Sequence, residues 1–305
     1  MDAKTALTFA AGAAAGLALA HVMRPCAGRE VASDPNQPRR FAAQQAANCT
    51  RALDIDAHFE PALLKGKRVV VTGANRGLGL ALVHELVKCG AVVIGVCRKT
   101  SEELSAAGVA QIIEGIDVTQ DSTMAKLASD LGATGPVHCL VNNAGYFMRE
   151  RESVVGKTMD FGEELKQIDI CAVGILRTTD ALFGAGLLPQ GSKVAMITSQ
   201  GGSIAWRDTQ CPEGGDYGHH MSKAAANMAG KLVANELRGS GVAVGILHPG
   251  FNRTQMTAKY SHIWDIEGAV ESAVGAKRVL HEINELSMDT TGRFTNCEDG
   301  MLIPW

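Results

Sequence analysis

The feature that most constrains the fold is a series of short apolar, β-branched segments that alternate with helical stretches after Lys65. Six such segments read KRVVVTG, AVVIGVCR, AQIIEGID, GPVHCLVNNAG, SKVAMITS and VAVGILHPG. Between them lie stretches such as GLALVHELVKCG, whose apolar residues recur at helical spacing. Strands that are apolar throughout are typical of a parallel sheet with helices on both faces. The sequence therefore predicts a doubly wound α/β domain over residues 65–305, with a ligand site at the carboxyl ends of its strands.

The first apolar segment runs directly into a glycine-rich turn, TGANRGLG, at residues 72–79. Gly73, Gly77 and Gly79 give the spacing G-x-x-x-G-x-G, and the helix-like stretch LGLALVHELV follows. Glycines permit a tight turn and a close approach of the backbone to a pyrophosphate, which then sits at a helix N-terminus. Because a strand precedes the turn and a helix follows it, the motif indicates Rossmann-type dinucleotide binding.

The chain begins with an apolar run at residues 6–23, ALTFAAGAAAGLALAHVM, within a segment of residues 1–24. The run is just long enough to span a bilayer, although it is rich in Ala and Gly. Three interpretations stay open: a membrane anchor, which we favour, a cleaved targeting segment, and an apolar helix with neither role. Residues 25–64 lack clear periodicity and predict a linker with at most one short helix.

Charge and cysteine usage exclude several classes of function. The net charge is −3, no block of Lys and Arg is present and aromatic residues are few, so we expect no nucleic-acid partner. None of the eight cysteines is paired at C-x-x-C spacing, so we expect no zinc site or redox motif. Reduced thiols fit a domain that lies in a reducing compartment, whether the protein is membrane-associated or targeted to an organelle.

Further motifs follow the other apolar segments. NNAG at 142–145 follows the fourth, and HPG at 248–250 follows the sixth. With the glycine turn, they make residues 66–305 resemble the short-chain dehydrogenase/reductase family. The stretches GGDYGHHMSKAAANM and GRFTNCEDGMLIPW resemble its carbonyl-reductase-like branch, which includes sniffer and C-factor proteins.

The resemblance implies a cofactor site. In the family the NNAG motif shapes the adenine side of the cleft, an aspartate placed like Asp117 meets the adenine, and the Pro-Gly pair borders the nicotinamide. A threonine placed like Thr254 contacts the carboxamide or the phosphates. The expected cofactor-binding residues are Gly73, Asn75, Arg76, Gly77, Leu78, Gly79, Arg98, Asp117, Asn143, Ala144, Gly145, Lys223, Pro249, Gly250 and Thr254.

The end of the second apolar segment indicates which dinucleotide is bound. An acidic residue there would hydrogen-bond a ribose 2′-hydroxyl and repel a 2′-phosphate. This chain has Arg98, whose guanidinium offers two parallel hydrogen bonds to that phosphate. Arg76 in the glycine turn points to the same cofactor, so the sequence favours NADP(H) over NAD(H).

By resemblance, the family's chemistry needs a tyrosine, a lysine four residues later, a serine and an asparagine. Ser199 matches the serine and Lys223 the lysine. His219 stands at the tyrosine position and Cys171 at the asparagine position, so both departures affect the path of the proton. Tyr217 is six residues from Lys223, which places it about 120° away around a helix. We therefore do not expect Tyr217 to replace the missing tyrosine.

The resulting hypothesis is an NADP(H)-dependent oxidoreductase that interconverts a carbonyl and an alcohol on a small or lipid-like substrate. Ser199 would polarise the substrate oxygen, His219 would exchange the proton, and Lys223 would hold the ribose and tune His219. The segments 200–216 and 255–270 are expected to line the substrate pocket.

Two rival hypotheses stay open. One is a non-catalytic NADP(H)-binding protein that acts as a sensor or scaffold. The other is a membrane-attached structural protein without cofactor, which the three intact motifs disfavour. Members of the family are often dimers or tetramers, and monomers occur in this branch, so a homo-oligomer is possible by resemblance.

Overall fold

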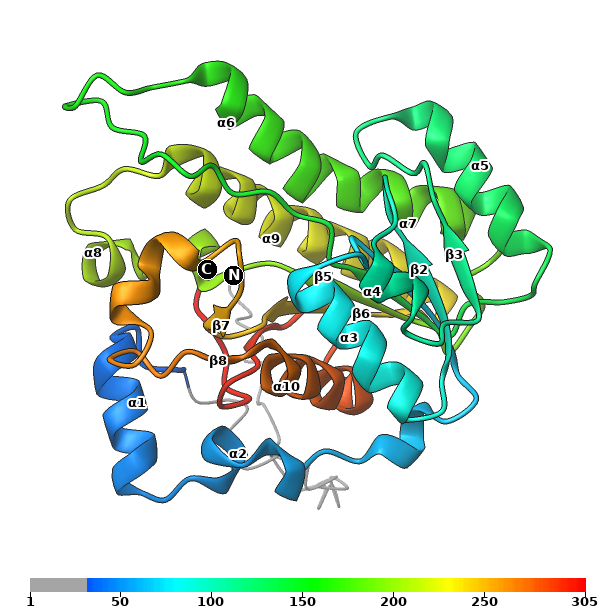
Figure 1. The fold of residues 1–305 in the computed structure, drawn as a ribbon, viewed down its shortest axis with the longest axis horizontal. Helices are drawn as coiled ribbons and strands as arrows, with labels where there is room; N and C mark the ends of the chain where they lie inside the picture. The colour runs from blue at the N-terminus through cyan, green and yellow to red at the C-terminus, as the bar shows by residue number, and fades with distance from the viewer. Residues whose placement is uncertain (1–31) are drawn as a thin grey trace, which may run out of the picture.

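A computed structural model describes residues 32–305 and shows a seven-stranded, fully parallel sheet with the strand order β3-β2-β1-β4-β5-β6-β9 (Figure 1). The strands are β1 (Arg68–Thr72), β2 (Val92–Val96), β3 (Gln111–Ile113), β4 (Cys139–Asn142), β5 (Lys193–Ile197), β6 (Ala243–His248) and β9 (Phe294–Asn296). The first six lie inside the six apolar segments of the sequence. The predicted doubly wound, Rossmann-type fold is therefore confirmed.

The strands are apolar because both of their faces are covered. All five residues of β1 are buried, and Val70 pairs with Ile94 of β2 on one side and with Leu140 of β4 on the other. Helices α3 (Gly77–Lys88) and α10 (Ser272–Glu285) cover one face, where their apolar side chains share a core with Val69 and Val71. The opposite face packs against α5 (Asp121–Gly132), α7 (Gly174–Gly184) and α9 (Tyr217–Leu237) (Figure 1).

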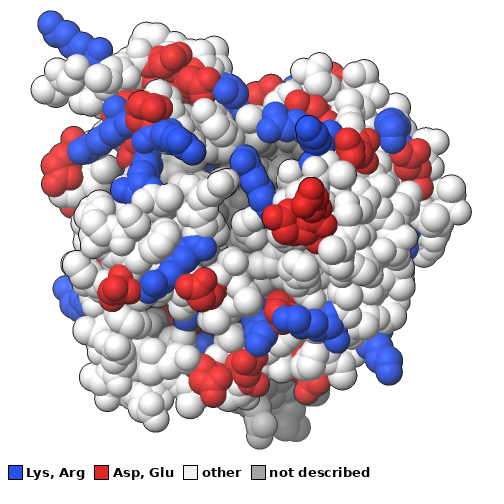
Figure 2. All heavy atoms as spheres, in the orientation of Figure 1, with Lys and Arg blue, Asp and Glu red and all other residues white. Residues whose placement is uncertain are grey.

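The remaining elements lie around these three layers. They are α1 (Gln37–Ala46), α2 (Thr50–Leu53), η1 (Ile55–Ala57), η2 (Pro61–Leu64), α4 (Glu102–Ser105), α6 (Phe161–Ile168), a π-helical turn η3 (Asp169–Val173), η4 (Gln200–Gly202), α8 (Arg207–Gln210), η5 (Arg238–Ser240), η6 (Ala258–Ile263) and the short pair β7 (Asn252–Arg253) and β8 (Val270–Glu271). Acidic and basic side chains are interspersed over the face of the molecule in Figure 2.

The stretch that the sequence assigns to a linker, residues 25–64, is folded over its described part. Helix α1 begins where the Asn36 side chain accepts a hydrogen bond from the Arg39 amide, and Pro38 occupies its first turn. Lys277 of α10 forms a 2.7 Å ion pair with Asp56. Residues 32–64 are therefore packed onto the domain through contacts with residues more than 200 positions away.

The apolar run 6–23 lies outside the described residues. Among residues 32–305, no helix is long and apolar enough to cross a membrane.

The topology of the sheet determines where the site must lie. Strand β1 sits between β2 and β4, so the direction in which strands are added to the sheet reverses at this point. Ligands of doubly wound folds bind beyond the carboxyl ends of the strands at such a reversal. The glycine turn after β1 and the NNAG motif after β4 meet there.

Candidate active site

The glycine turn after β1 has a backbone conformation that side chains other than glycine rarely adopt. Gly73 and Gly77 have φ angles of +66° and +55°, in the left-handed region that favours glycine. At Gly79, a β-carbon would lie 2.2 Å from the carbonyl oxygen of Gly73. Asn143 braces the turn from the neighbouring strand, because its side-chain amide donates to the carbonyl of Thr72 at 3.0 Å. The turn is therefore compact, and its shape depends on the glycines.

The turn leaves hydrogen-bond donors free at the start of α3. The first backbone N–H groups of a helix have no helical partner, and within residues 32–305 no side chain caps α3 at Arg76. Asn75 holds the turn against the loop after β2, because its side chain donates to the carbonyl of Lys99 at 2.9 Å. Free N–H groups at the positive end of a helix are the donors that a diphosphate needs. Residues 73–79, including the half-buried Leu78, therefore fit the pyrophosphate of a dinucleotide.

Two arginines lie exposed beside this turn. Arg98 follows β2, and its guanidinium lies 3.8 Å from the Asp117 carboxylate, a distance that leaves the pair weak and open to solvent. Arg76 is exposed at the N-terminus of α3. Asp117 lies in the loop beyond the end of β3 at Ile113, and its Oδ1 accepts a hydrogen bond from the Thr119 amide. Both arginines are free to meet a phosphate.

The opposite end of the cleft is formed by Pro249, Gly250 and the segment after them. Gly250 has a φ of +81°, and a β-carbon on it would lie 2.6 Å from Cγ of Glu298. Thr254 faces the glycine turn, since a β-carbon on Gly77 would lie 3.9 Å from its side chain. The structure therefore brings the ends of the expected cofactor site together across the sheet edge.

Ser199 lies at the carboxyl end of β5, where its side chain begins the η4 turn. Its Oγ accepts a hydrogen bond from the Gly201 amide at 3.0 Å. Gly202 allows the turn to pack onto α9, because a β-carbon there would lie 2.6 Å from the carbonyl oxygen of Lys223. The two glycines therefore place Ser199 directly beside the helix that carries His219 and Lys223.

His219 and Lys223 are one turn apart on α9 and share a helix face. Lys223 is buried, and its Nζ donates to the carbonyl of Ile197 at 3.4 Å. Tyr217 is the first residue of α9, and its hydroxyl lies beside Gly214, away from the cavity that Ser199 and His219 line. The structure therefore brings together the three residues that the sequence nominated and leaves Tyr217 apart.

The surroundings of His219 keep its imidazole neutral. Its ring stacks on Phe147 with the centroids 4.2 Å apart, and Nδ1 has no hydrogen-bond partner among the described residues. Burial lowers the pKa of His219 well below its usual value, and the positive charge of Lys223 lowers it further. A neutral imidazole with a free ring nitrogen can accept a proton more readily than it can donate one.

Cys171 lies in the π-helical turn η3 and is buried. Its Sγ is 3.4 Å from both the amide nitrogen and the carbonyl oxygen of Tyr146, directly after Gly145. A thiol is a weak hydrogen-bond donor and acceptor, so Cys171 offers this position less hydrogen-bonding capacity than a side-chain amide would. A π-helical turn within a helix is a frequent feature of functional sites.

A cavity of about 250 Å³ opens beside Ser199 and His219. Gln200, Arg207 and Asp216 line it from the segment 200–216, and Tyr260 and Glu267 line it from the segment 255–270, as expected. The cavity is also lined by residues 35–38, which the sequence analysis assigned to the linker. The signal for this part was local: Asn36 followed by a proline two positions later is typical of a helix start.

The fold and the glycine turn define a dinucleotide-binding oxidoreductase of the doubly wound class, and comparison with known proteins agrees. The family model for short chain dehydrogenases matches residues 67–263. The chain therefore belongs to the short-chain dehydrogenase family.

Individual relatives span most of the chain. It is 32% identical to 1-hydroxy-2-glutathionyl-2-methyl-3-butene dehydrogenase of Rhodococcus sp. (strain AD45) over 238 residues, covering 78% of this chain and 99% of the relative. It is 34% identical to C-signal of Myxococcus xanthus over 174 residues, covering 56% of this chain and 95% of that protein. The structure of carbonyl reductase Sniffer of D. melanogaster superposes with a TM-score of 0.67 at 25% identity, covering 79% of this chain and 100% of the other.

The NADPH-bound carbonyl reductase from chicken fatty liver has the same fold, with a TM-score of 0.67 at 22% identity and coverage of 79% and 100%.

Proposed function

We propose that this protein is an NADP(H)-dependent reductase or dehydrogenase that interconverts a carbonyl and an alcohol on a small molecule. The observation that carries the proposal is the meeting of three parts at one sheet edge. These are the glycine turn with free N–H donors, the exposed Arg76 and Arg98, and the cavity lined by Ser199 and His219.

The cofactor assignment rests on charge and on the shape of the turn. The N-terminus of α3 would bind the diphosphate, and the guanidinium of Arg98 would bind a ribose 2′-phosphate in place of its weak contact with Asp117. No acidic residue ends β2, the position at which a carboxylate would repel that phosphate. An NADPH-bound carbonyl reductase with the same fold is consistent with this cofactor.

Bound NADP⁺ would accept the hydride of the alcohol carbon while a base takes the hydroxyl proton, and in the reverse direction NADPH would return the hydride to the carbonyl carbon as the protonated base returns the proton; the chain's own residues would position the substrate and handle that proton. The Ser199 hydroxyl would donate a hydrogen bond to the substrate oxygen. The buried Lys223, whose Nζ makes a long contact of 3.4 Å with the Ile197 carbonyl, would bind the nicotinamide ribose. The stack of His219 on Phe147 fixes the imidazole at the cavity wall, where it would take a proton from an alcohol.

A second candidate is a protein that binds NADP(H) without turnover. Two points favour it. Burial first of all lowers the pKa of His219 well below its usual value, and by the resemblance the buried Cys171 stands where the family has an asparagine. A neutral imidazole is a poor acid, so reduction by the family's usual route would lack its proton donor.

The test is turnover by the full chain. NADPH oxidation would be followed with a panel of aldehydes and ketones, and NADP⁺ reduction with the corresponding alcohols. The proposal predicts that the wild type turns over and that Ser199→Ala loses about 100-fold or more of this activity. Ser199→Ala should still bind NADPH, as measured by the change in NADPH fluorescence. Absence of turnover in both directions, with NADPH bound normally, would favour the second candidate. Absence of NADPH binding would refute both.

A further inference from the structure

The segment from Ala32 to the end of α1, residues 32–46, lies as a strap beside the β7–β8 pair and the segment between them (Figure 1). We call it the N-terminal strap. Its first residue pairs with Leu302, and the Ser33 hydroxyl donates to the Asp299 carboxylate at 2.6 Å. The strap is therefore attached to the residues that follow the last strand of the sheet.

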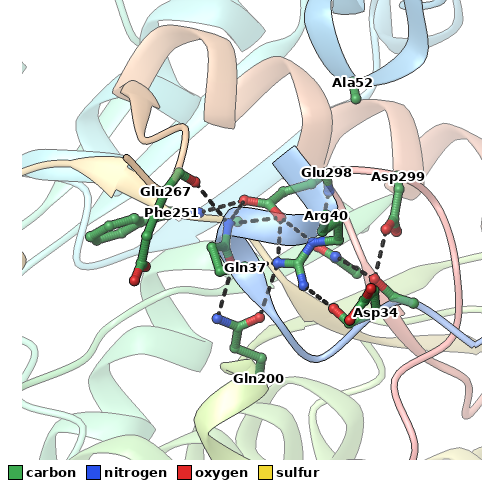
Figure 3. A network of polar contacts seen from close by, with 12 residues as sticks. Asp34, Gln37, Arg40, Ala52, Gln200, Phe251, Glu267, Glu298 and Asp299 are labelled. Carbon is green, nitrogen blue, oxygen red and sulfur yellow. Dashed lines mark hydrogen bonds and ion pairs between the residues drawn. The ribbon is translucent and has the colours of Figure 1, made fainter. Parts of the chain in front are cut away.

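A buried ion pair holds the middle of the strap (Figure 3). The Arg40 guanidinium lies 2.7 Å from the Glu298 carboxylate, and both residues are only 4% exposed. Burial alone would raise the pKa of Glu298, but the surrounding positive charges, that of Arg40 first, and the hydrogen bond from the Phe251 amide together hold that pKa well below its ordinary value. Buried charges of this kind depend on their partners, so the strap and Glu298 are bound to each other.

Glu298 connects this ion pair to one side of the active site. Its Oε1 accepts a hydrogen bond from the Phe251 amide at 3.0 Å, and its Cγ lies against Gly250. These residues directly follow Pro249, which by the proposed function borders the nicotinamide. The carboxylate therefore holds the loop that would face the reacting end of the cofactor.

Arg40 connects the same ion pair to a second part of the active site, the turn after Ser199. Its guanidinium also donates to the side-chain oxygen of Gln200 at 3.2 Å, and the Gln200 amide donates to Gln37 of the strap at 3.1 Å. Gln200 is the residue after Ser199 and begins the η4 turn. Figure 3 shows Gln37 and Arg40 of the strap between Gln200 and Glu298. One arginine thus bridges the serine turn and the loop after Pro249.

We propose that Arg40 is a positioning residue of the active site and that the N-terminal strap is a built-in wall of the substrate cavity. Residues 35–38 line the cavity together with Ser199 and His219. The fork of the Arg40 guanidinium sets the distance between the serine turn and the loop after Pro249. This inference rests on the proposed function for the roles of Ser199 and Pro249, and on the contacts alone for the link between the two loops.

The test compares Arg40→Lys with Arg39→Lys in the full chain. Lysine keeps the charge that Glu298 needs, so the variant is expected to fold, but its single ammonium cannot also hold Gln200 in place. Arg39 is the matched control, because it lies one position earlier and its side chain is 67% exposed. Hydrogen exchange would be measured for the amides of residues 199–203 and 250–252, together with NADPH affinity and turnover.

The expected result is faster exchange in both segments of Arg40→Lys, by about tenfold, with slow exchange retained in β4 and β5. Turnover should fall by about 10- to 100-fold while the dissociation constant of NADPH changes less than about threefold. Arg39→Lys should match the wild type in all readouts. The inference would be overturned if residues 199–203 and 250–252 exchanged at the same rate in Arg40→Lys as in Arg39→Lys. It would also be overturned if exchange in Arg40→Lys became faster by the same factor over the whole chain. A wild type without turnover would refute the proposed function, yet exchange would still decide the role of Arg40.

Discussion

Replacing Gly79 by alanine tests whether the turn after β1 is the cofactor site. Gly79 lies in the first turn of α3, and the new β-carbon would be 2.2 Å from the Gly73 carbonyl oxygen and 2.5 Å from the Asn143 side-chain nitrogen. Ordinary contacts begin at 3.4 Å, so the turn would have to move by about 1 Å. The obstacle at Gly73 is backbone, and Asn143 is bound to the Thr72 carbonyl, so no side chain can simply rotate away.

This overlap has a cost in stability and a cost in binding. Overpacking of this size lowers the free energy of unfolding by about 1–3 kcal/mol. The N–H groups that would bind the diphosphate move with the turn. Their hydrogen bonds to a charged ligand weaken, and we expect the affinity for NADPH to fall by about tenfold or more.

Gly132→Ala is the matched control, because Gly132 also lies in a helix, is exposed, and has no atom within 4 Å of the new β-carbon. Alanine there should raise the free energy of unfolding by up to about 1 kcal/mol. Thermal melts and NADPH fluorescence titrations would measure both variants. If Gly79→Ala binds NADPH as well as the wild type and Gly132→Ala do, the turn is not the cofactor site and the reasoning fails.

Three further predictions concern charge, pH and the cavity wall. Arg98→Asp should weaken NADPH binding by about tenfold or more, while NADH binding is kept or improved. Lys65→Asp, at the amino ends of the strands, is the control and should change the affinity for neither cofactor. Fluorescence titration with each cofactor measures both variants. His248 is buried, and this burial lowers its pKa from 6.5 to about 4. The stability that its neutral form contributes is therefore fully present above pH 6.5, and the free energy of unfolding should fall by about 3 kcal/mol as the pH drops to 4. Denaturant melts across this range should show a smaller pH dependence in His248→Leu, and an unchanged one would contradict the assignment. Pro38→Trp should raise KM for bulky ketones such as 2-acetylnaphthalene more than for butanal, because Pro38 lines the cavity. Arg39→Trp, at an exposed position, is the control. An equal rise in KM for both substrates would argue against the N-terminal strap as a wall of the substrate cavity.

The parts of the fold that the sequence predicted are those that local patterns specify. Strands β1, β2 and β5 read as continuous apolar runs because helices cover both of their faces. The glycine turn could be placed because a strand precedes it and a helix follows. Strand β9 was missed because it has only three residues, Phe294–Asn296, too few to show a pattern, and only their pairing with β6 makes them a strand.

The parts of the site that the sequence could not predict depend on contacts between distant residues. Ser199, His219 and Lys223 were nominated by resemblance; the structure places Ser199 and His219 at one cavity and Lys223 one turn further along α9. The strap was read as a linker because nothing in residues 32–46 shows that Arg40 meets a carboxylate 258 positions later. Arg40 can be buried because Glu298 pairs with it, and the local sequence pattern around Arg40 cannot indicate such a distant partner.

The most direct test of the account compares the full-length wild type with His219→Ala and His219→Tyr. NADPH binding and turnover would be measured on the same samples. Turnover would be followed with NADPH and carbonyl substrates in one direction and with NADP⁺ and alcohols in the other. The account predicts that all three proteins bind NADPH, that the wild type turns over, and that His219→Ala loses about 100-fold or more of that activity. A wild type that binds NADPH but is silent, with activity gained in His219→Tyr, would contradict a catalytic role for His219.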